Sequence, residues 1–413
     1  MPADEALARA ALTTARDRSV SVASAGYGLD ALNLLVANIQ TGFGPFVAVF
    51  LASQGWTQTA IGVALSLGTI TAMASQIPAG ALVDAIAAKS WVALASILAF
   101  SLSALLFALW PIPLSIYIAE ILHGFSSCTL GPVIAALSLA IAGPGLLGQR
   151  LGRNARFASI GNGVGAALMG ACGYYFSERS VFFLTAALSL PAIGALVPLW
   201  RFDWRAAPSA AAKEEGPKPI WRLLRDRRLL VFAAAAALFS LGNASLLPLA
   251  SIGVTKHATS EANLMIAGCI ILPQALVALI SPAVGRLAEQ RGRRILLFAG
   301  FAALSARAFI FSFVSEPILL VAIQALDGVA GACFGVMIPL VTADIAGRSG
   351  HFNLCLGLVG FAIGIGATIS TTLAGLVADS FGDPAAFLGF GIIGVLGGLL
   401  AWTAMPETRP ERQ

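Results

Sequence analysis

Charged side chains are scarce in this chain of 413 residues: Asp, Glu, Lys and Arg together make up 11% of the sequence, and hydrophobic residues make up 58%. A soluble domain carries about 25% charged residues, so the composition excludes an ordinary soluble protein and indicates a chain that lies in a bilayer. The net charge of +5 does not indicate a nucleic-acid partner. The basic residues lie in loops beside apolar runs, where they set the orientation and meet anionic lipid.

Cysteine is also rare, and no cysteine lies at the short spacing of a metal site or a disulfide framework. We therefore expect no metal and no disulfide. The sequence also lacks an ATP-binding motif and a nucleophile cluster such as Ser-His-Asp, so we expect neither a nucleotide cofactor nor an enzyme. The five cysteines read as small packing residues within apolar runs; they are Cys128, Cys172, Cys269, Cys333 and Cys355.

Long apolar runs account for most of the chain. About 20 apolar residues in a helix cross the ~30 Å hydrocarbon layer of a bilayer. Cutting the runs at charges and at Gly or Pro turns gives twelve such spans, so we expect an all-α membrane protein with twelve transmembrane helices. The expected spans are 26–52, 58–83, 90–110, 112–142, 153–176, 180–200, 229–254, 262–285, 295–314, 317–345, 351–378 and 385–405.

The positive charges indicate how these spans are oriented, because Lys and Arg beside membrane spans remain on the cytosolic side. If both termini are cytosolic, 22 of the 25 Lys and Arg residues fall in segments expected inside. Only Arg179 and Lys256 fall outside, and Arg307 lies within a span. This asymmetry predicts N- and C-termini in the cytosol and supports an even number of spans.

A basic turn after the second span recurs after the eighth. The second copy is Gly285–Arg294, with four cations in ten residues, and the first copy is Gly80–Lys89, which lies 205 residues earlier. Both copies keep an acid four places after the glycine, which is Asp84 in the first and Glu289 in the second. Two copies in the same place predict two halves of similar plan.

Three further matches, in the same order along both halves, support this duplication. Gln40 and Pro45 match Asn243 and Pro248 at a spacing of 203, Glu120–Gly124 matches Gln324–Gly328 at 204, and Gly152, Arg153 and Phe157 match Gly347, Arg348 and Phe352 at 195. Between the halves lies one long polar stretch with too little apolar content to fold alone. The expected organisation is a cytosolic N-terminal segment 1–25, a six-helix half 26–200, a cytosolic linker 201–228, a six-helix half 229–405 and a C-terminal tail 406–413.

The repeated turn resembles the signature loop of the major facilitator superfamily, which reads Gly, any residue, Leu, any residue, Asp or Glu, two further places, Gly, Arg, then Arg or Lys. The second copy matches at nearly every place, whereas the first has Ala85, Ala87 and Ala88 where the pattern has Arg, Gly and Arg. Parallel repeats of six spans around a midplane substrate site are the plan of that superfamily. The drug-efflux branch is the one that this chain looks most like.

The resemblance implies a role for the turn. In that family the acid and the basic cluster hold the cytosolic ends of the helices together in one state of the transport cycle. On this basis we expect the second copy to latch strongly and the first, through Asp84 and Lys89 near Gly80, to latch weakly. The simpler alternative is that the cations only fix the topology. The residues of the second copy are Gly285, Glu289, Arg291, Gly292, Arg293 and Arg294.

Ionisable residues within spans are candidate coupling sites, because each costs about 2.5–3.5 kcal/mol on insertion scales. Glu120 and His123 lie one helical turn apart, in a frame where the family's exporters often have Arg-x-x-Gln-Gly, so the charge sign is reversed here. A buried carboxyl beside an imidazole can carry a proton near neutral pH. We predict that Glu120 takes the coupling proton and His123 tunes or relays it. A fixed interhelical hydrogen bond for Glu120 and a structural role for His123 are the alternatives.

Three more ionisable residues lie in spans. Asp327 stands at the repeat-equivalent place of the tenth span and is a second proton or cation candidate. Arg307, in the ninth span, is either its counter-ion or a residue that snorkels to the outer surface. Asp30, one turn inside the cytosolic end of the first span, is expected to be a solvated entrance residue.

Uncharged polar residues are candidates for the substrate cavity, which the resemblance places among the first, fourth, seventh and tenth helices. Pro and Gly in the first and seventh spans loosen the backbone and permit a bend. Ordinary Pro kinking and interhelical packing is the alternative reading. The candidate residues are Asn33, Gln40, Thr41, Ser127, Asn243 and Gln324.

These features predict a secondary active transporter in the inner, cytoplasmic membrane of a bacterial-type cell, driven by a proton gradient and without a bound cofactor. We expect proton-coupled efflux of a small organic compound, because the expected cavity helices are rich in Ala, Gly, Leu and Phe. Proton-symport uptake of a small organic solute is the main alternative, and a membrane sensor without transport activity is a third. The expected partners are a small-molecule substrate and the lipid bilayer; the chain is expected to act as a monomer and not to bind nucleic acid.

Overall fold

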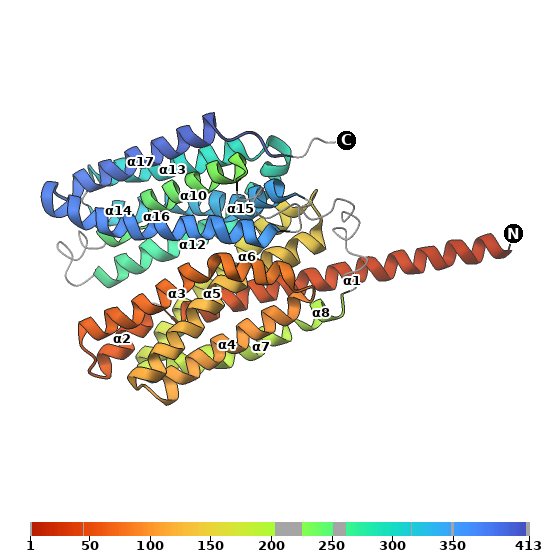
Figure 1. The fold of residues 1–413 in the computed structure, drawn as a ribbon, viewed down its shortest axis with the longest axis horizontal. Helices are drawn as coiled ribbons and strands as arrows, with labels where there is room; N and C mark the ends of the chain where they lie inside the picture. The colour runs from red at the N-terminus through yellow and green to blue at the C-terminus, as the bar shows by residue number, and fades with distance from the viewer. Residues whose placement is uncertain are drawn as a thin grey trace.

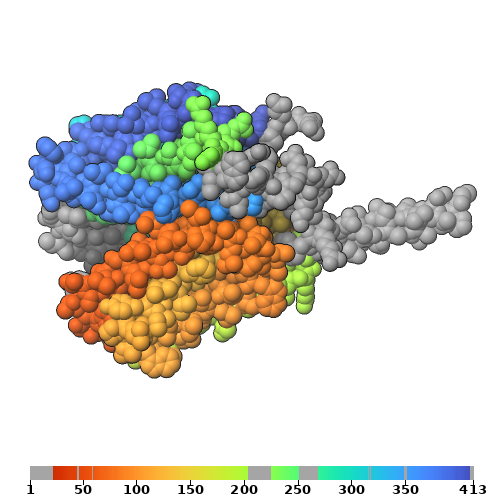
Figure 2. Space-filling model, in the orientation of Figure 1, coloured from red at the N-terminus to blue at the C-terminus, as the bar shows by residue number. Residues whose placement is uncertain are grey.

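The computed structural model describes residues 2–43, 45–202, 225–250, 262–314, 316–347 and 351–409. In these ranges the chain is helical and contains no β-strand. Most of the expected linker, together with Lys256 and Arg348, lies outside the described residues. The helices form two sets that lie against each other (Figures 1 and 2), in agreement with the expected all-α membrane fold.

The first set, drawn in red to yellow-green in Figure 1, packs around buried phenylalanines such as Phe43, Phe100 and Phe107. The α1 helix begins at Pro2, well before the expected start of the first span, and the chain breaks between α1 and α2, where the Gly-Pro turn was expected to permit a bend. The helices are α1 (Pro2–Thr41), α2 (Pro45–Ser53), α3 (Gln58–Ala85), α4 (Lys89–Leu109), α5 (Pro113–Ala142), α6 (Leu147–Tyr175), α7 (Glu178–Gly194) and α8 (Val197–Trp200).

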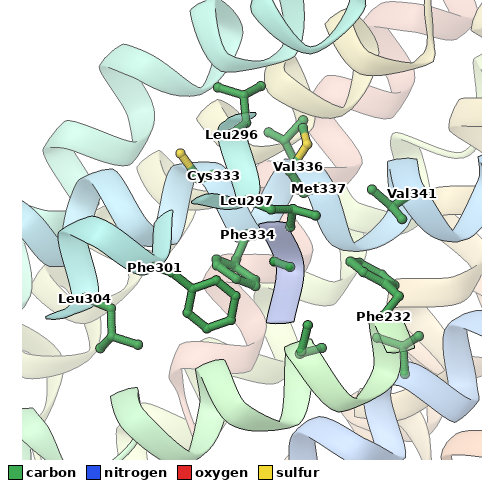
Figure 3. Close-up of a cluster of buried hydrophobic side chains, with 14 of the residues drawn as sticks. Phe232, Leu296, Leu297, Phe301, Leu304, Cys333, Phe334, Val336, Met337 and Val341 are labelled. Carbon is green, nitrogen blue, oxygen red and sulfur yellow. The ribbon is translucent and has the colours of Figure 1, made fainter. Parts of the chain in front are cut away.

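The second set, drawn in green to blue, has a core built on stacked aromatic rings. Phe334 stacks on Phe239 with ring centroids 3.6 Å apart and meets Phe301 edge-on at 5.1 Å; Figure 3 shows Phe301 and Phe334 within this cluster. The helices are α10 (Arg227–Asn243), α12 (Ala262–Arg291), α13 (Arg294–Phe311), α14 (Pro317–Ile323), α15 (Ala325–Ala346), α16 (Phe352–Phe381) and α17 (Asp383–Thr403).

In the described part of the chain, eleven candidate spans are long and apolar enough to cross a membrane. They coincide with eleven of the twelve expected spans. The remaining one, 153–176, forms α6, whose 29 residues are long enough to cross but whose first turns carry Arg150, Arg153 and Arg156. The arginines lower the mean hydropathy of α6, but the helix is still long enough to cross a membrane. With α6 counted, the architecture has the twelve expected helices.

The two sets meet mainly along two seams, which are made by three helix pairs. The α3 helix packs against α16, and α6 packs against α12 and α15. Each pair joins a helix of the first set to a helix of the second. These two seams position the site described next.

Candidate functional site

The acid of the first turn, Asp84, joins α3 to the start of α16. Its Oδ1 accepts hydrogen bonds from the Asn353 backbone N–H (3.0 Å) and from Asn353 Nδ2 (2.7 Å), and its Oδ2 accepts from the Leu354 N–H (2.8 Å). The first N–H groups of a helix lack partners within it and carry the positive end of the helix dipole, so a carboxylate is favoured there. Asp84 therefore connects the two sets of helices.

The acid of the second turn, Glu289, makes the matching contact on the other seam. Its Oε1 accepts from the Gln149 backbone N–H (3.0 Å) and its Oε2 from Gln149 Nε2 (2.7 Å), at the start of α6. The two copies of the turn therefore make equivalent contacts. In each copy the acid accepts hydrogen bonds from the first turn of a helix that belongs to the other set.

Glycines allow the helices to approach closely beside both acids. A Cβ atom at Gly148 would lie 2.8 Å from the Gly285 carbonyl oxygen, and one at Gly80 would overlap the Asn353 carbonyl. Gly152 lies equally close to the Ser281 backbone. Contact through small residues is a common way for membrane helices to pack. At the end of the bundle that the Lys and Arg count assigns to the cytosol, the two sets are thus closed against each other.

The cations of the turns act within their own set. Arg293 pairs with Asp344 of α15 (2.9 Å), and the Arg294 guanidinium lies 4.3 Å from the centre of the Trp402 ring. Lys89 donates to the Val83 carbonyl of its own turn, and Arg291 is exposed. Asp84 thus accepts three hydrogen bonds across the seam and Glu289 two, and the expectation that the second copy latches more strongly stays a prediction.

The second turn is also held by the C-terminal tail. Gly292 has φ +101°, a conformation that only glycine adopts readily. This geometry presents the N–H groups of Arg293 and Arg294 to the Glu407 carboxylate, at 2.8 Å and 3.2 Å. The glycine of the motif is thus required by the backbone, and the following residues form the capped start of α13.

A cavity of about 510 Å3 lies between the two sets of helices. Its lining comes from α1, α3, α5, α6, α12, α15 and α16. The expectation that the first, fourth, seventh and tenth helices line the cavity is correct for three of them. The seventh, α10, contributes none of the described lining residues, because α16 lies between α10 and the first set.

Of the six expected cavity residues, Asn33 lies in the cavity lining. Thr41 donates to the Ala37 carbonyl of its own helix (2.8 Å). Asn243 and Gln324 bind Arg307, and the described lining includes neither Gln40 nor Ser127. The polar lining residues that the sequence reading passed over are Gln76, Asn154, Ser159, Asn162 and Gln274. The signal in the sequence that indicates them is an uncharged amide or hydroxyl within an apolar span.

Glu120 and His123 lie inside the first set of helices and not in the cavity. Glu120 is 2% exposed, and its Oε2 lies 3.6 Å from His123 Nδ1. The His123 ring stacks on Phe43 with centroids 4.2 Å apart. The carboxylate of Glu120 occupies the space beside Gly68 of α3, where a Cβ atom would overlap it. In the part of the chain that is described, Glu120 Oε1 is buried without a hydrogen-bond partner.

Arg307 lies at the centre of a polar cluster in the second set. Its side chain is 1% exposed and forms an ion pair with Asp327. It also donates to Gln324 Oε1 (3.2 Å) and to Asn243 Oδ1 (3.0 Å). Of the two readings of Arg307, the structure therefore shows the counter-ion to Asp327 and not a snorkelling residue.

Asp30 is not a solvated entrance residue, so that expectation is wrong. It is 3% exposed and forms ion pairs with Arg150 and Arg153 of α6. Arg150 also donates through Nε to Asn154 Oδ1 (2.8 Å). A helix-start arginine pair in α6 can hold a carboxylate of α1 because these two helices pack together.

Two sets of membrane-spanning helices, closed against each other at one end and enclosing a cavity, define the class of secondary membrane transporters. The profile of the Major Facilitator Superfamily matches residues 29–315 and 232–413. The chain belongs to this superfamily.

Two relatives from Mycobacterium tuberculosis support the same assignment. Each is described as an uncharacterized MFS-type transporter, one from strain CDC 1551 / Oshkosh and one from strain ATCC 25618 / H37Rv. Each is 33% identical to this chain over 387 residues, which cover 92% of this chain and 93% of the relative. The protein is thus a multi-pass transporter of the cytoplasmic membrane that moves a small-molecule substrate.

Proposed function

We propose that this transporter exports a small organic compound in exchange for protons, by alternating access of the cavity to the two sides of the membrane. The helices within 26–200 and 229–405 act as the two moving halves. The cavity is built within one chain, so the proposed unit of transport is a monomer. Each cycle has to break the Asp84 and Glu289 contacts, because these join the halves at the cytosolic end.

The observation that carries the proton coupling is the buried, unpaired oxygen of Glu120. A buried polar atom without a partner is expensive to keep, so such a site commonly has a functional reason. A proton on the Glu120 carboxyl removes its charge and supplies an O–H that His123 Nδ1, 3.6 Å away and itself unpaired among the described residues, accepts after a small movement. Glu120 is therefore the proposed proton site, and His123 its relay.

The α3 helix connects this site to the cavity and to the gate. Gly68 contacts Glu120, Gln76 lines the cavity, and Asp84 holds α16. Protonation of Glu120 changes what α3 packs against, and movement of α3, which contains Pro78 between Gln76 and Asp84, passes that change to the far end. This supports coupling between the proton site and the closed cytosolic end. Asp327, paired with Arg307, is the second candidate site.

Transport in proteoliposomes with an imposed pH gradient tests the proposal, using a panel of labelled organic compounds on wild type and Glu120→Gln. Wild type is expected to move a compound against the direction of the proton flux. The proton-driven flux of Glu120→Gln is expected to be at least about tenfold lower than that of wild type, because the variant lacks a group that transfers protons. Substrate exchange without a gradient is expected to continue.

Asp379→Asn is the matched control, because Asp379 is an exposed acid of α16. Unchanged coupling in Glu120→Gln would remove Glu120 from the mechanism. Substrate movement in the same direction as the protons would replace export by uptake symport.

A further inference from the structure

The described lining of the cavity contains neither a charged nor an aromatic side chain. Its polar members are three asparagines, two glutamines and a serine; the remainder are aliphatic residues, prolines and glycines. At Gly131 and Gly335 a Cβ atom would find no neighbour within 4 Å, so these walls leave room for a ligand. The volume of about 510 Å3 lies in the range of small-molecule sites.

Buried charged groups of the fold are occupied elsewhere than in the cavity, and Arg156, between two lining residues of α6, is exposed and donates to the Ala278 carbonyl (2.9 Å). Asp30 is held by Arg150 and Arg153, and Arg307 is held by Asp327. Glu120 faces α3 beside Gly68. A charged ligand in the cavity would therefore have no opposite charge to meet, and burying an unpaired charge is strongly unfavourable.

The described lining holds no aromatic ring, and large aromatic clusters lie inside each set of helices. Phe43 stacks on His123 and meets Phe100 edge-on inside the first set, and Phe334 stacks on Phe239 inside the second. Aromatic faces are what commonly bind organic cations and flat ring systems. The described lining offers neither.

Four of the five amides that line the cavity retain hydrogen-bonding capacity among the described residues: Gln76 and Asn162 make no side-chain hydrogen bond there, and Gln274 and Asn33 each keep an oxygen that accepts none. Gln274 Oε1 is buried and has no partner among the described residues. Asn33 donates through Nδ2 to the Leu29 carbonyl (2.7 Å), and within the described ranges no residue donates to its Oδ1. Asn154, by contrast, is already bound at both ends, to Arg150 and to Ser138. Gln274 and Asn33 thus present acceptors for a donor group of the ligand.

We propose that the substrate is an uncharged, aliphatic compound that carries amide or hydroxyl donors, bound between Asn33 and Gln274. This rests on the proposed transport function, because it takes the cavity as the substrate site. Neutral amides recognise amide or hydroxyl groups, and the aliphatic walls cover an apolar body. Gln274 contributes a buried, uncharged acceptor to this recognition.

Three small probes of similar shape test this inference: N-acetyl-leucinamide is neutral, N-acetyl-leucine is an anion and leucinamide is a cation at about pH 6. The reporter is Ala158→Cys, a half-buried cavity position, in full-length protein whose five native cysteines are replaced. The neutral probe is expected to slow N-ethylmaleimide labelling of this cysteine about fivefold or more, and the charged probes less than about twofold. N-acetyl-phenylalaninamide is the aromatic counterpart and is expected to protect less than the leucine compound.

A Gln274→Glu variant provides a second test. Because it places a carboxylate in the lining, the cation leucinamide is expected to protect the reporter cysteine better than the neutral probe does. The same probes are added to the wild-type chain in a thermal-unfolding assay, so that the result does not depend on the cysteine-free variant. Better protection by either charged probe, or none by the neutral probe in both assays, would overturn the inference. Protection by the neutral probe without proton-driven flux would instead overturn only the proposed coupling.

Discussion

The Asp84 carboxylate accepts both the backbone N–H and the side-chain Nδ2 of Asn353, at 3.0 Å and 2.7 Å, across the seam between the two sets of helices. Residue 84 lies at the end of α3 and residue 353 at the start of α16, so this carboxylate joins the two sets at the cytosolic end on this side. The Glu289 contact with Gln149 joins them on the other side.

Replacing Asp84 by alanine is expected to open the cytosolic end more often. The loss of a side chain that caps a helix costs about 1 kcal/mol, which corresponds to a roughly fivefold shift of the equilibrium. We expect an impermeant maleimide to label the Ala158→Cys reporter about fivefold faster from the cytosolic side in inside-out vesicles. Asp226→Ala is the control, because Asp226 caps α10 within its own set by accepting from the Arg228 N–H (2.8 Å).

The matching change at Glu289 gives a second, independent shift of the same equilibrium. Because the two acids hold different seams, the free-energy effects of Asp84→Ala and Glu289→Ala are expected to add in the double variant. Equal labelling rates in Asp84→Ala and Asp226→Ala would show that the contact does not hold the gate.

Gly68→Ala is expected to abolish proton coupling although Glu120 is still present. The added methyl group would overlap the Glu120 carboxylate and push it away from its place between α3 and α5. The proton-driven flux should fall about as far as in Glu120→Gln, while protection of the cavity reporter by N-acetyl-leucinamide is retained. Gly62→Ala, in the same helix with no neighbour within 4 Å of the new Cβ, is the control and should couple normally. Normal coupling in Gly68→Ala would show that the position of Glu120 is unimportant.

Removing one partner of the Arg307–Asp327 pair is expected to destabilise the second set of helices. Arg307 is 1% exposed, so Asp327→Asn leaves a buried charge without its counter-ion. Breaking a buried pair costs about 3–5 kcal/mol. The Asp327 side chain is 27% exposed, which places the expected loss at about 3 kcal/mol or less. Thermal unfolding of the purified chain measures it.

The double variant Arg307→Met with Asp327→Leu distinguishes the contribution of the ion pair to stability from the contribution of side-chain packing in this cluster. It is expected to recover most of the lost stability, since it removes both charges together. Arg179→Ala, at an exposed outer position, is the control. A double variant as unstable as Asp327→Asn would show that the amide contacts of Asn243 and Gln324, and not the ion pair, hold the cluster.

The positions of the spans followed from the sequence alone, because the hydrocarbon layer imposes one length and one polarity on every helix that crosses it. The α3, α5 and α17 helices begin and end within a few residues of the expected spans. The repeated turn likewise identified Asp84 and Glu289 as equivalent residues, because a duplication leaves the same spacing in both halves.

The faces that these helices turn toward one another were decided only by the tertiary structure. In a soluble helix the buried face is the apolar one, but in a bilayer the lipid-facing and protein-facing sides are both apolar, so periodicity carries little information. For this reason the sequence does not show that two residues of the same helix face different neighbours: the packing of α5 turns Glu120 toward α3 and leaves Gly131 in the cavity. Which amides line the cavity, and which acid meets which helix start, depends on how the two halves dock.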